Sequence, residues 1–168
     1  MTSRYLSEEA AKRLVNSDPR DVKGLNVKEV RKQAESMLLE IEEKLKFAND
    51  LTCLEMRVRC NDYHEAKESL NDLGEPYGQL SSYIERQGES VRARFYLLTP
   101  TKYQPRRVAI NPARKTGYSP AQLRKVAGEY EGEMAAMTEE HYARLRLQAV
   151  KIREMLKKIR AMKTFPTK

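Results

Sequence analysis

The stretch that decides the fold is residues 142–159, YARLRLQAVKIREMLKKI. Its apolar residues are spaced alternately three and four positions apart, which places them along one side of an α-helix. The same spacing forms the seam between helices that pair through a heptad repeat. The seam residues are Tyr142, Leu145, Ala149, Ile152, Leu156 and Ile159. Because soluble monomers seldom leave such a stripe uncovered, the segment predicts a long helix with an apolar partner.

A second long helix is predicted over residues 26–52, where Asn26 can cap the first turn and apolar residues recur with similar spacing. Acidic residues flank this stripe, namely Glu35, Glu40, Glu42 and Glu43, whereas lysines and arginines flank the C-terminal seam. Opposite flanking charges set partner choice in paired helices, so we expect the two helices to pair within one chain. The alternatives are a homo-oligomer and a helix from another protein.

Between these helices the apolar period changes to two residues, which is typical of strands. Residues 54–60 alternate in this way and predict a strand with Leu54, Met56, Val58 and Cys60 in the core. Two further alternating runs, 80–85 and 91–98, are separated by a turn-rich segment and predict a hairpin. Residues 106–110 are a candidate fourth strand.

The C-terminal region, residues 119–163, is predicted to be helical. Ser119 and Pro120 give a cap followed by proline at the first helical position, and the helix is expected to run towards Met137. Thr138 is expected to open the next helix, which carries the seam.

The predicted fold class is therefore α+β and mainly helical, with two long amphipathic helices, N- and C-terminal, flanking a small antiparallel sheet of three to four strands. A chain of 168 residues is long enough for one core and short for two. We expect an N-terminal helix and linker over residues 1–25, a single domain over 26–165 with its sheet region at 54–110, and a frayed tail at 166–168.

Charge is distributed unevenly along the chain. Residues 1–90 carry 14 Lys and Arg against 18 Asp and Glu, whereas residues 91–168 carry 18 against 6. A basic half of this kind indicates a polyanionic partner, either nucleic acid (DNA or RNA) or an acidic protein surface. Alternatively, the acidic N-terminal half of the same chain compensates this basic charge.

The strongest basic signal is residues 91–127, which contain nine Lys and Arg and no acidic residue. In a strand, Arg92, Arg94 and Tyr96 would share one face, and such a face binds phosphates while its aromatic ring stacks a base. The alternative is a solvated face of cross-strand ion pairs. The candidate nucleic-acid contacts are Arg57, Arg59, Arg92, Arg94, Tyr96, Lys102, Arg106, Arg107, Arg114 and Lys115.

The sequence contains no recognisable catalytic or metal-binding pattern, and no cofactor is expected. His64 and His141 lie among charged residues and are interpreted as exposed, while the spacing of Cys53 and Cys60 fits neither a CxxC motif nor a zinc site. No run approaches the roughly 20 apolar residues of a membrane span, and the N-terminus lacks a secretory signal, so we expect a cytoplasmic protein without membrane contact.

These patterns predict a non-enzymatic protein that associates with nucleic acid. Its basic C-terminal half would hold the phosphate backbone with low sequence specificity, because no recognition helix is evident. The alternative is a structural or adaptor subunit of a protein assembly, docking through its long amphipathic helices.

Overall fold

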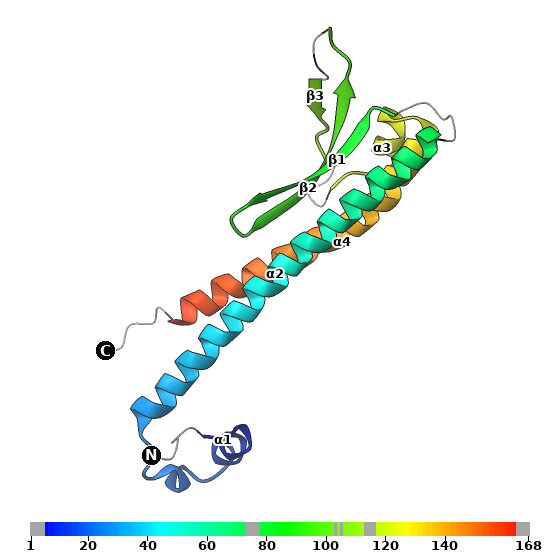
Figure 1. The fold of residues 1–168 in the computed structure, drawn as a ribbon. Helices are drawn as coiled ribbons and strands as arrows, with labels where there is room; N and C mark the ends of the chain where they lie inside the picture. Colours follow the sequence, from blue (N-terminus) through cyan, green and yellow to red (C-terminus); the bar gives the residue numbers. More distant parts are fainter. Residues whose placement is uncertain (1–5, 73–77, 103, 105, 113–116, 164–168) are drawn as a thin grey trace. The chain divides into compact units, whose positions relative to one another are not determined.

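The computed structural model describes residues 6–72, 78–102, 104, 106–112 and 117–163 (Figure 1). The elements in chain order are α1 (Glu8–Val15), the 3₁₀ helix η1 (Pro19–Val22), α2 (Val27–Asp72), β1 (Leu80–Gln87), β2 (Ser90–Thr99), β3 (Arg106–Ala109), α3 (Pro120–Val126) and α4 (Glu129–Lys163). The predicted α+β, mainly helical class is confirmed, with one long helix before and one after a three-stranded sheet in the chain. The expected tail at 166–168 lies outside the described residues.

Two compact units make up the chain, one of residues 1–44 with 157–168 and one of residues 45–156. In the first unit, Ser7 caps α1 by accepting a hydrogen bond from the Ala10 amide at 3.1 Å. The side-chain amide of Gln33 on α2 exchanges hydrogen bonds with both the backbone N and O of Leu6, at 3.1 and 2.7 Å. Asn26 accepts from the Lys28 amide at 3.0 Å, which confirms it as the cap of α2.

The six seam residues of α4 are all buried, and the cover comes from the same chain. Flanking charges of opposite sign also meet, although only Glu42 is one of the acids expected to do so. In one unit Arg144 Nη2 lies 2.7 Å from Glu55 Oε1, and in the other Arg160 Nε lies 3.1 Å from Glu42 Oε1. The expected pairing of charges between α2 and α4 is therefore present at Glu42, whereas Glu55 had been expected on a strand.

The expected strand at residues 54–60 is wrong, because α2 continues without a break to Asp72. A helix turns about 100° per residue, so alternate residues fall on different faces. Met56 is fully buried, whereas Leu54 and Val58 point outward and are each 57% exposed. This part of α2 is apolar on two opposite sides, and that pattern imitates the two-residue period of a strand.

The boundary between the last two helices also differs from the prediction. Ser119 caps α3 by accepting from the Gln122 amide at 3.1 Å, as expected, but the helix ends at Val126. Thr138 opens no new helix; its hydroxyl donates to the Met134 carbonyl within α4. Gly132 explains the earlier turn, because a Cβ there would lie 2.7 Å from the Arg124 Cα of α3. Only glycine permits so close an approach.

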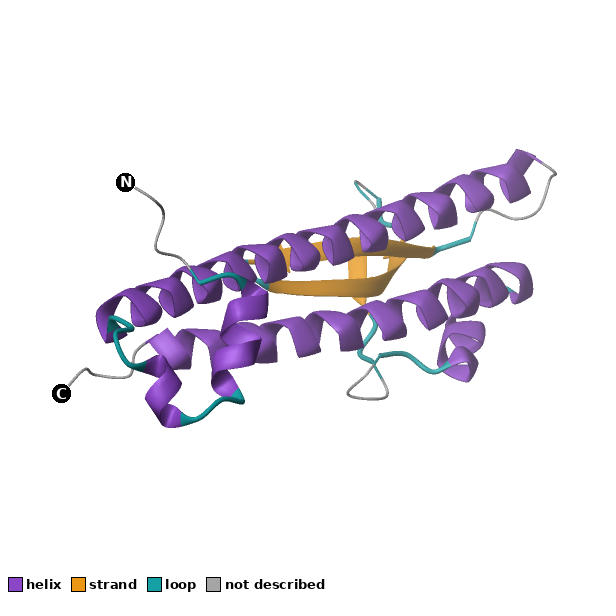
Figure 2. Cartoon of the chain, turned by 90° about the horizontal axis from the view of Figure 1, so that it is seen from below, coloured by secondary structure: helices purple, strands orange, loops and turns teal. Residues whose placement is uncertain are grey.

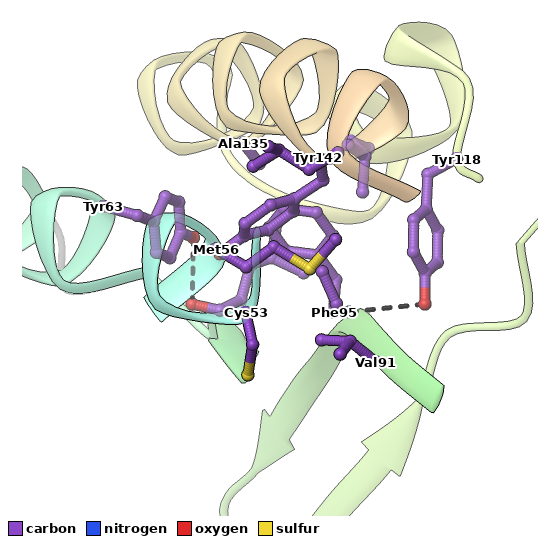
Figure 3. Close-up of a cluster of buried hydrophobic side chains, with 12 residues drawn as sticks. Cys53, Met56, Tyr63, Val91, Phe95, Tyr118, Ala135 and Tyr142 are labelled. Carbon is purple, nitrogen blue, oxygen red and sulfur yellow. Dashed lines mark hydrogen bonds between the residues drawn. The ribbon is translucent and has the colours of Figure 1, made fainter. Parts of the chain in front are cut away.

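The sheet is antiparallel with strand order β1-β2-β3, which confirms the hairpin and the strand at 106–110. Gly88, with φ of 59°, provides the left-handed residue of the β1–β2 turn. The sheet lies against one side of α2 and α4 (Figure 2). Its inner face contributes Phe95 to the core, where the Phe95 ring meets those of Tyr63, Tyr118 and Tyr142 at centroid distances of 5.9, 5.4 and 5.9 Å (Figure 3).

Two leucines of α4 test this assignment of the core. Leu145 is fully buried in the aromatic cluster, whereas Leu147, two residues along the same helix, is 53% exposed. Leu145→Ala is expected to lower the free energy of unfolding by about 2–5 kcal/mol, because it leaves a cavity. Leu147→Ala is expected to change it by less than about 0.5 kcal/mol. Urea unfolding of the two variants measures the difference, and equal losses would contradict the assignment.

Candidate nucleic-acid interface

The strand register decides which side chains share the outer face of the sheet. Tyr83 lies opposite Arg94 across the β1–β2 pair, and Leu98 lies opposite Arg107 across the β2–β3 pair. Directly opposed residues point to the same side, and residues two apart on one strand do so as well. The face away from Phe95 therefore carries five residues that we call the arginine face, namely Tyr83, Arg92, Arg94, Tyr96 and Arg107.

The two tyrosines of the arginine face differ in access. Tyr96 is buried: its hydroxyl accepts from Ser81 Oγ at 3.1 Å, and the Arg107 guanidinium lies 5.2 Å from its ring centroid. The Tyr83 ring meets Tyr96 edge-on at 5.3 Å and is itself half-buried. Tyr83 is consequently the better placed of the two to receive a stacked base.

Cations outnumber acids on this face. Arg94 Nε lies 3.3 Å from Glu85 Oε2, so the alternative of cross-strand ion pairs holds for this arginine. Glu85 lies directly opposite Arg92, but Arg92 is exposed and has no ion-pair partner among the described residues. Exposed guanidinium groups in excess of carboxylates attract phosphate.

A pocket of about 420 Å³ adjoins the arginine face at the edge of β2. It lies there because β3 ends at Ala109, so that among the described residues no strand pairs with residues 92–94 on that side. Its lining residues are Arg92, Ala93, Arg94, Ile110, Asn111, Pro112, Gly117, Tyr118 and Arg146. Burial raises the pKa of the Tyr118 phenol, whose oxygen accepts from the Phe95 amide at 3.3 Å.

Arg146 at the base of this pocket is held by a buried carboxylate. Its two terminal nitrogens lie 2.6 and 2.9 Å from the oxygens of Glu139, and Nη2 also donates to the Ala93 carbonyl at 3.0 Å. Glu139 in turn accepts from the Tyr118 amide at 2.9 Å. A Cβ at position 117 would lie 2.0 Å from a Glu139 oxygen, so this site requires Gly117. Arg146 thus fixes the β2 edge, and its charge is compensated.

Two predicted contacts are misplaced. Arg57 and Arg59 were expected to repeat the arginine pattern on a neighbouring strand, but both lie on α2, away from the sheet face. Arg59 Nη1 lies 3.3 Å from Asp62 one turn further along the helix. The error follows directly from the strand predicted at residues 54–60.

The remaining candidate nucleic-acid contacts do not share one surface. Arg106 is exposed but pairs with Thr99, which places it on the face opposite to Arg107. Lys102 is exposed in the loop before β3. Arg114 and Lys115 lie outside the described residues.

Sequence reasoning missed the buried carboxylate of Glu139 and the partly buried guanidinium of Arg146 that pairs with it. A signal existed, because Glu131, Ala135, Glu139 and Tyr142 follow one another at spacings of four, four and three and so share the inner side of α4. The interpretation of His64 as exposed is also wrong: it is half-buried, and its Nε2 lies 3.0 Å from the Ser82 carbonyl oxygen. A hydrogen bond with Cys60 raises the pKa of His64.

The geometry defines a class of protein: an α+β protein in which long helices support a small antiparallel sheet with an arginine-rich outer face. The family model described as MobI protein matches residues 54–160, which is more than half of the chain, so the chain belongs to the MobI family. The match contains the whole sheet and the arginine face. No curated protein and no solved structure matches the chain.

The part of the chain that the structure describes contains neither a membrane-spanning helix nor a metal-binding cluster. No helix in this part of the chain is long and apolar enough to cross a bilayer. No group of three or more His, Cys, Asp or Glu side chains within the described segments is arranged to hold a metal ion.

Two glutamates of α4 test whether the ion pair of Glu139 and Arg146 holds the edge of β2 at the pocket. Glu139→Ala removes the carboxylate that pairs with the guanidinium of Arg146, which is 17% exposed, and is expected to cost about 3–5 kcal/mol of unfolding free energy. Glu133→Ala removes a solvent-exposed pair with Arg124 and is expected to leave stability unchanged. Thermal or urea unfolding distinguishes them. If Glu139→Ala left the free energy of unfolding unchanged, the pair of Glu139 and Arg146 would not be what holds the β2 edge.

Proposed function

We propose that this MobI-family chain is a non-enzymatic nucleic-acid-associated protein that holds the phosphate backbone on its arginine face. The observation that carries the proposal is the placement of Arg92, Arg94 and Arg107 on one side of the sheet, opposed there by the carboxylate of Glu85. Neutralising phosphates with arginine releases counterions, which drives binding to any sequence. The name of the family is one used for mobilization proteins, so we propose DNA as the nucleic acid.

The residues of the arginine face favour contact with a single nucleic-acid strand whose bases are unstacked. Tyr83 lies beside Arg94 across the strand pair, which combines a ring for stacking with a guanidinium for phosphate. Arg92 and Arg94 also line the pocket, whose volume of about 420 Å³ is ample for a phosphate group. Such contacts read the backbone and the aromatic face of a base rather than base edges, so sequence specificity should be low. A DNA partner would place this function in the cytoplasm.

A second candidate function is that of a structural or adaptor subunit in a protein assembly. One observation favours it: α2 presents several large apolar side chains to solvent on the side opposite the core, among them Phe47 and Leu54. The two functions are compatible, since the arginine face and this side of α2 are different surfaces.

The arginine face is tested by replacing Arg92, Arg94 and Arg107 together with glutamine. Affinity for a generic single-stranded DNA, measured by fluorescence anisotropy between 50 and 200 mM salt, is expected to fall for every sequence. The slope of log K against log salt is negative, and each lost phosphate contact reduces its magnitude by about 0.7 for a single strand. The magnitude of the slope should therefore fall by about two units.

A control with the same loss of charge replaces Lys23, Lys28 and Lys32, all exposed and in the acidic half of the chain, with glutamine. This variant is expected to bind DNA nearly as the parent does. If both triple variants lost affinity and slope equally, net charge alone would account for binding and the arginine face would not be the site. Circular dichroism confirms that both variants are folded.

A further inference from the structure

The outer side of α2 carries a contiguous apolar stripe. Its residues are Phe47, Leu51, Leu54 and Val58, which are 63, 48, 57 and 57% exposed. We call these four residues the outer stripe. Their spacing of four, three and four is that of residues aligned along one side of a helix. Contiguous exposed apolar surface of this kind marks an interaction site in a soluble protein.

The stripe lies opposite the residues by which α2 enters the core. Cys53, Met56 and Tyr63 are buried on the inner side of α2. At about 100° per residue, the outer stripe is centred about 180° around the helix from them. It therefore cannot be covered by the sheet or by α4, which contact the inner side.

The stripe is also short and bounded by polar residues. The same side of α2 carries Glu40 and Lys44 before Phe47, and Asn61 and Asp62 after Val58. From Phe47 to Val58 the stripe spans about 17 Å at 1.5 Å per residue. A surface of this length fits one face of a helix of about three turns.

We infer that the outer stripe binds the outer stripe of a second copy of this chain, with the two α2 helices antiparallel. The pattern is self-complementary: a two-fold axis between Leu51 and Leu54 places Phe47 over Val58 of the other copy and Leu51 over its Leu54. A two-fold interface uses the same patch on both subunits, as this arrangement requires.

The charges beside the stripe support a second copy and this orientation. Asp50 and Arg57 lie along the same edge of the stripe, in the positions where paired helices exchange charges. In the antiparallel arrangement Asp50 faces Arg57 of the other copy, twice by symmetry. A parallel arrangement would instead place Asp50 beside Glu55 of the other copy, which is repulsive.

Both residues have bonding capacity left for this contact. Asp50 accepts from Arg86 Nη2 at 2.5 Å through Oδ1, and its side chain remains 48% exposed. Arg57 is exposed and has no ion-pair partner among the described residues. The inference does not depend on the proposed nucleic-acid function, because the outer stripe and the arginine face are different surfaces.

Sedimentation equilibrium of the full chain from 1 to 100 μM tests the inference. The mass is expected to rise with concentration from 19.5 kDa towards twice that value, about 39 kDa. Leu51→Asp places a charge in the centre of the stripe and should weaken dimerisation at least 100-fold while circular dichroism stays unchanged. Leu147→Asp, at an exposed leucine of α4 outside the stripe, should dimerise as the parent does.

A parent that remains at 19.5 kDa throughout this range would overturn the inference, and a different protein would then be the occupant of the stripe. A parent that dimerises equally well with Leu51→Asp would overturn it too, because the interface would lie elsewhere.

Disulfide trapping tests the orientation. In the antiparallel dimer Leu51 faces Leu54 of the other copy, whereas the two Leu51 residues are offset along the axis beyond disulfide reach. A mixture of Leu51→Cys and Leu54→Cys chains should therefore yield a mixed disulfide under mild oxidation, and neither variant should link to itself. The parent, oxidised alongside, controls for Cys53 and Cys60, which are free thiols. Self-linked Leu51→Cys chains would show a parallel dimer and overturn the antiparallel arrangement.

Discussion

The sheet depends on a buried ion pair at the first residue of β1. Lys67 of α2 and Glu131 of α4 lie 2.8 Å apart with side chains 5% and 8% exposed, and together they hold the backbone of Leu80. The Leu80 amide donates to Glu131 at 3.0 Å, and its carbonyl accepts from Lys67 and from the Tyr63 hydroxyl. Two buried charges are costly unless they are paired and hydrogen-bonded, and the strand backbone supplies bonds that offset the cost. A slip of one residue in β1 would break this network and turn every side chain to the other face.

Glu139 repeats the arrangement two turns further along α4, where it joins Arg146 to the backbone at Ala93 and Tyr118. Glu131 and Glu139 are eight residues apart, or about 12 Å along the helix axis. One carboxylate anchors the start of the hairpin and the other anchors the edge of its second strand. With the inner face of the sheet fixed at both places, the arginines of the other face have a defined spacing. Such preorganisation lowers the entropy lost when a ligand binds.

The sequence predicts those parts of the structure that depend on a regular period or on a local cap. The seam from Tyr142 to Ile159, the hairpin and the cap at Ser119 need no knowledge of distant residues, and the shared face of Arg92, Arg94 and Tyr96 follows from the hairpin alone. The strand predicted at 54–60 was wrong because a helix with two apolar sides alternates much as a strand does. The ion pairs of Lys67 with Glu131 and of Glu139 with Arg146 were missed for another reason. Lys67, Glu131 and Glu139 are residue types that usually lie on the surface, and only tertiary packing buries them here. The distinction between Arg106 and Arg107 required the register of β3, which no local pattern encodes.

The alternation that imitated a strand has a physical meaning of its own. Leu54 and Val58 contribute nothing to the core, but with Phe47 and Leu51 they form one contiguous exposed apolar stripe rather than scattered single residues. In the inferred dimer this side of the helix is buried as well. The arginine face lies beyond the sheet and the outer stripe lies beyond α2, with the aromatic core between them, so a ligand on one surface does not obstruct the other. A dimer formed through the stripe would hold two arginine faces in one particle. Binding of the second face to the same DNA would then be intramolecular, which converts two weak, non-specific contacts into a tight one without any new interaction.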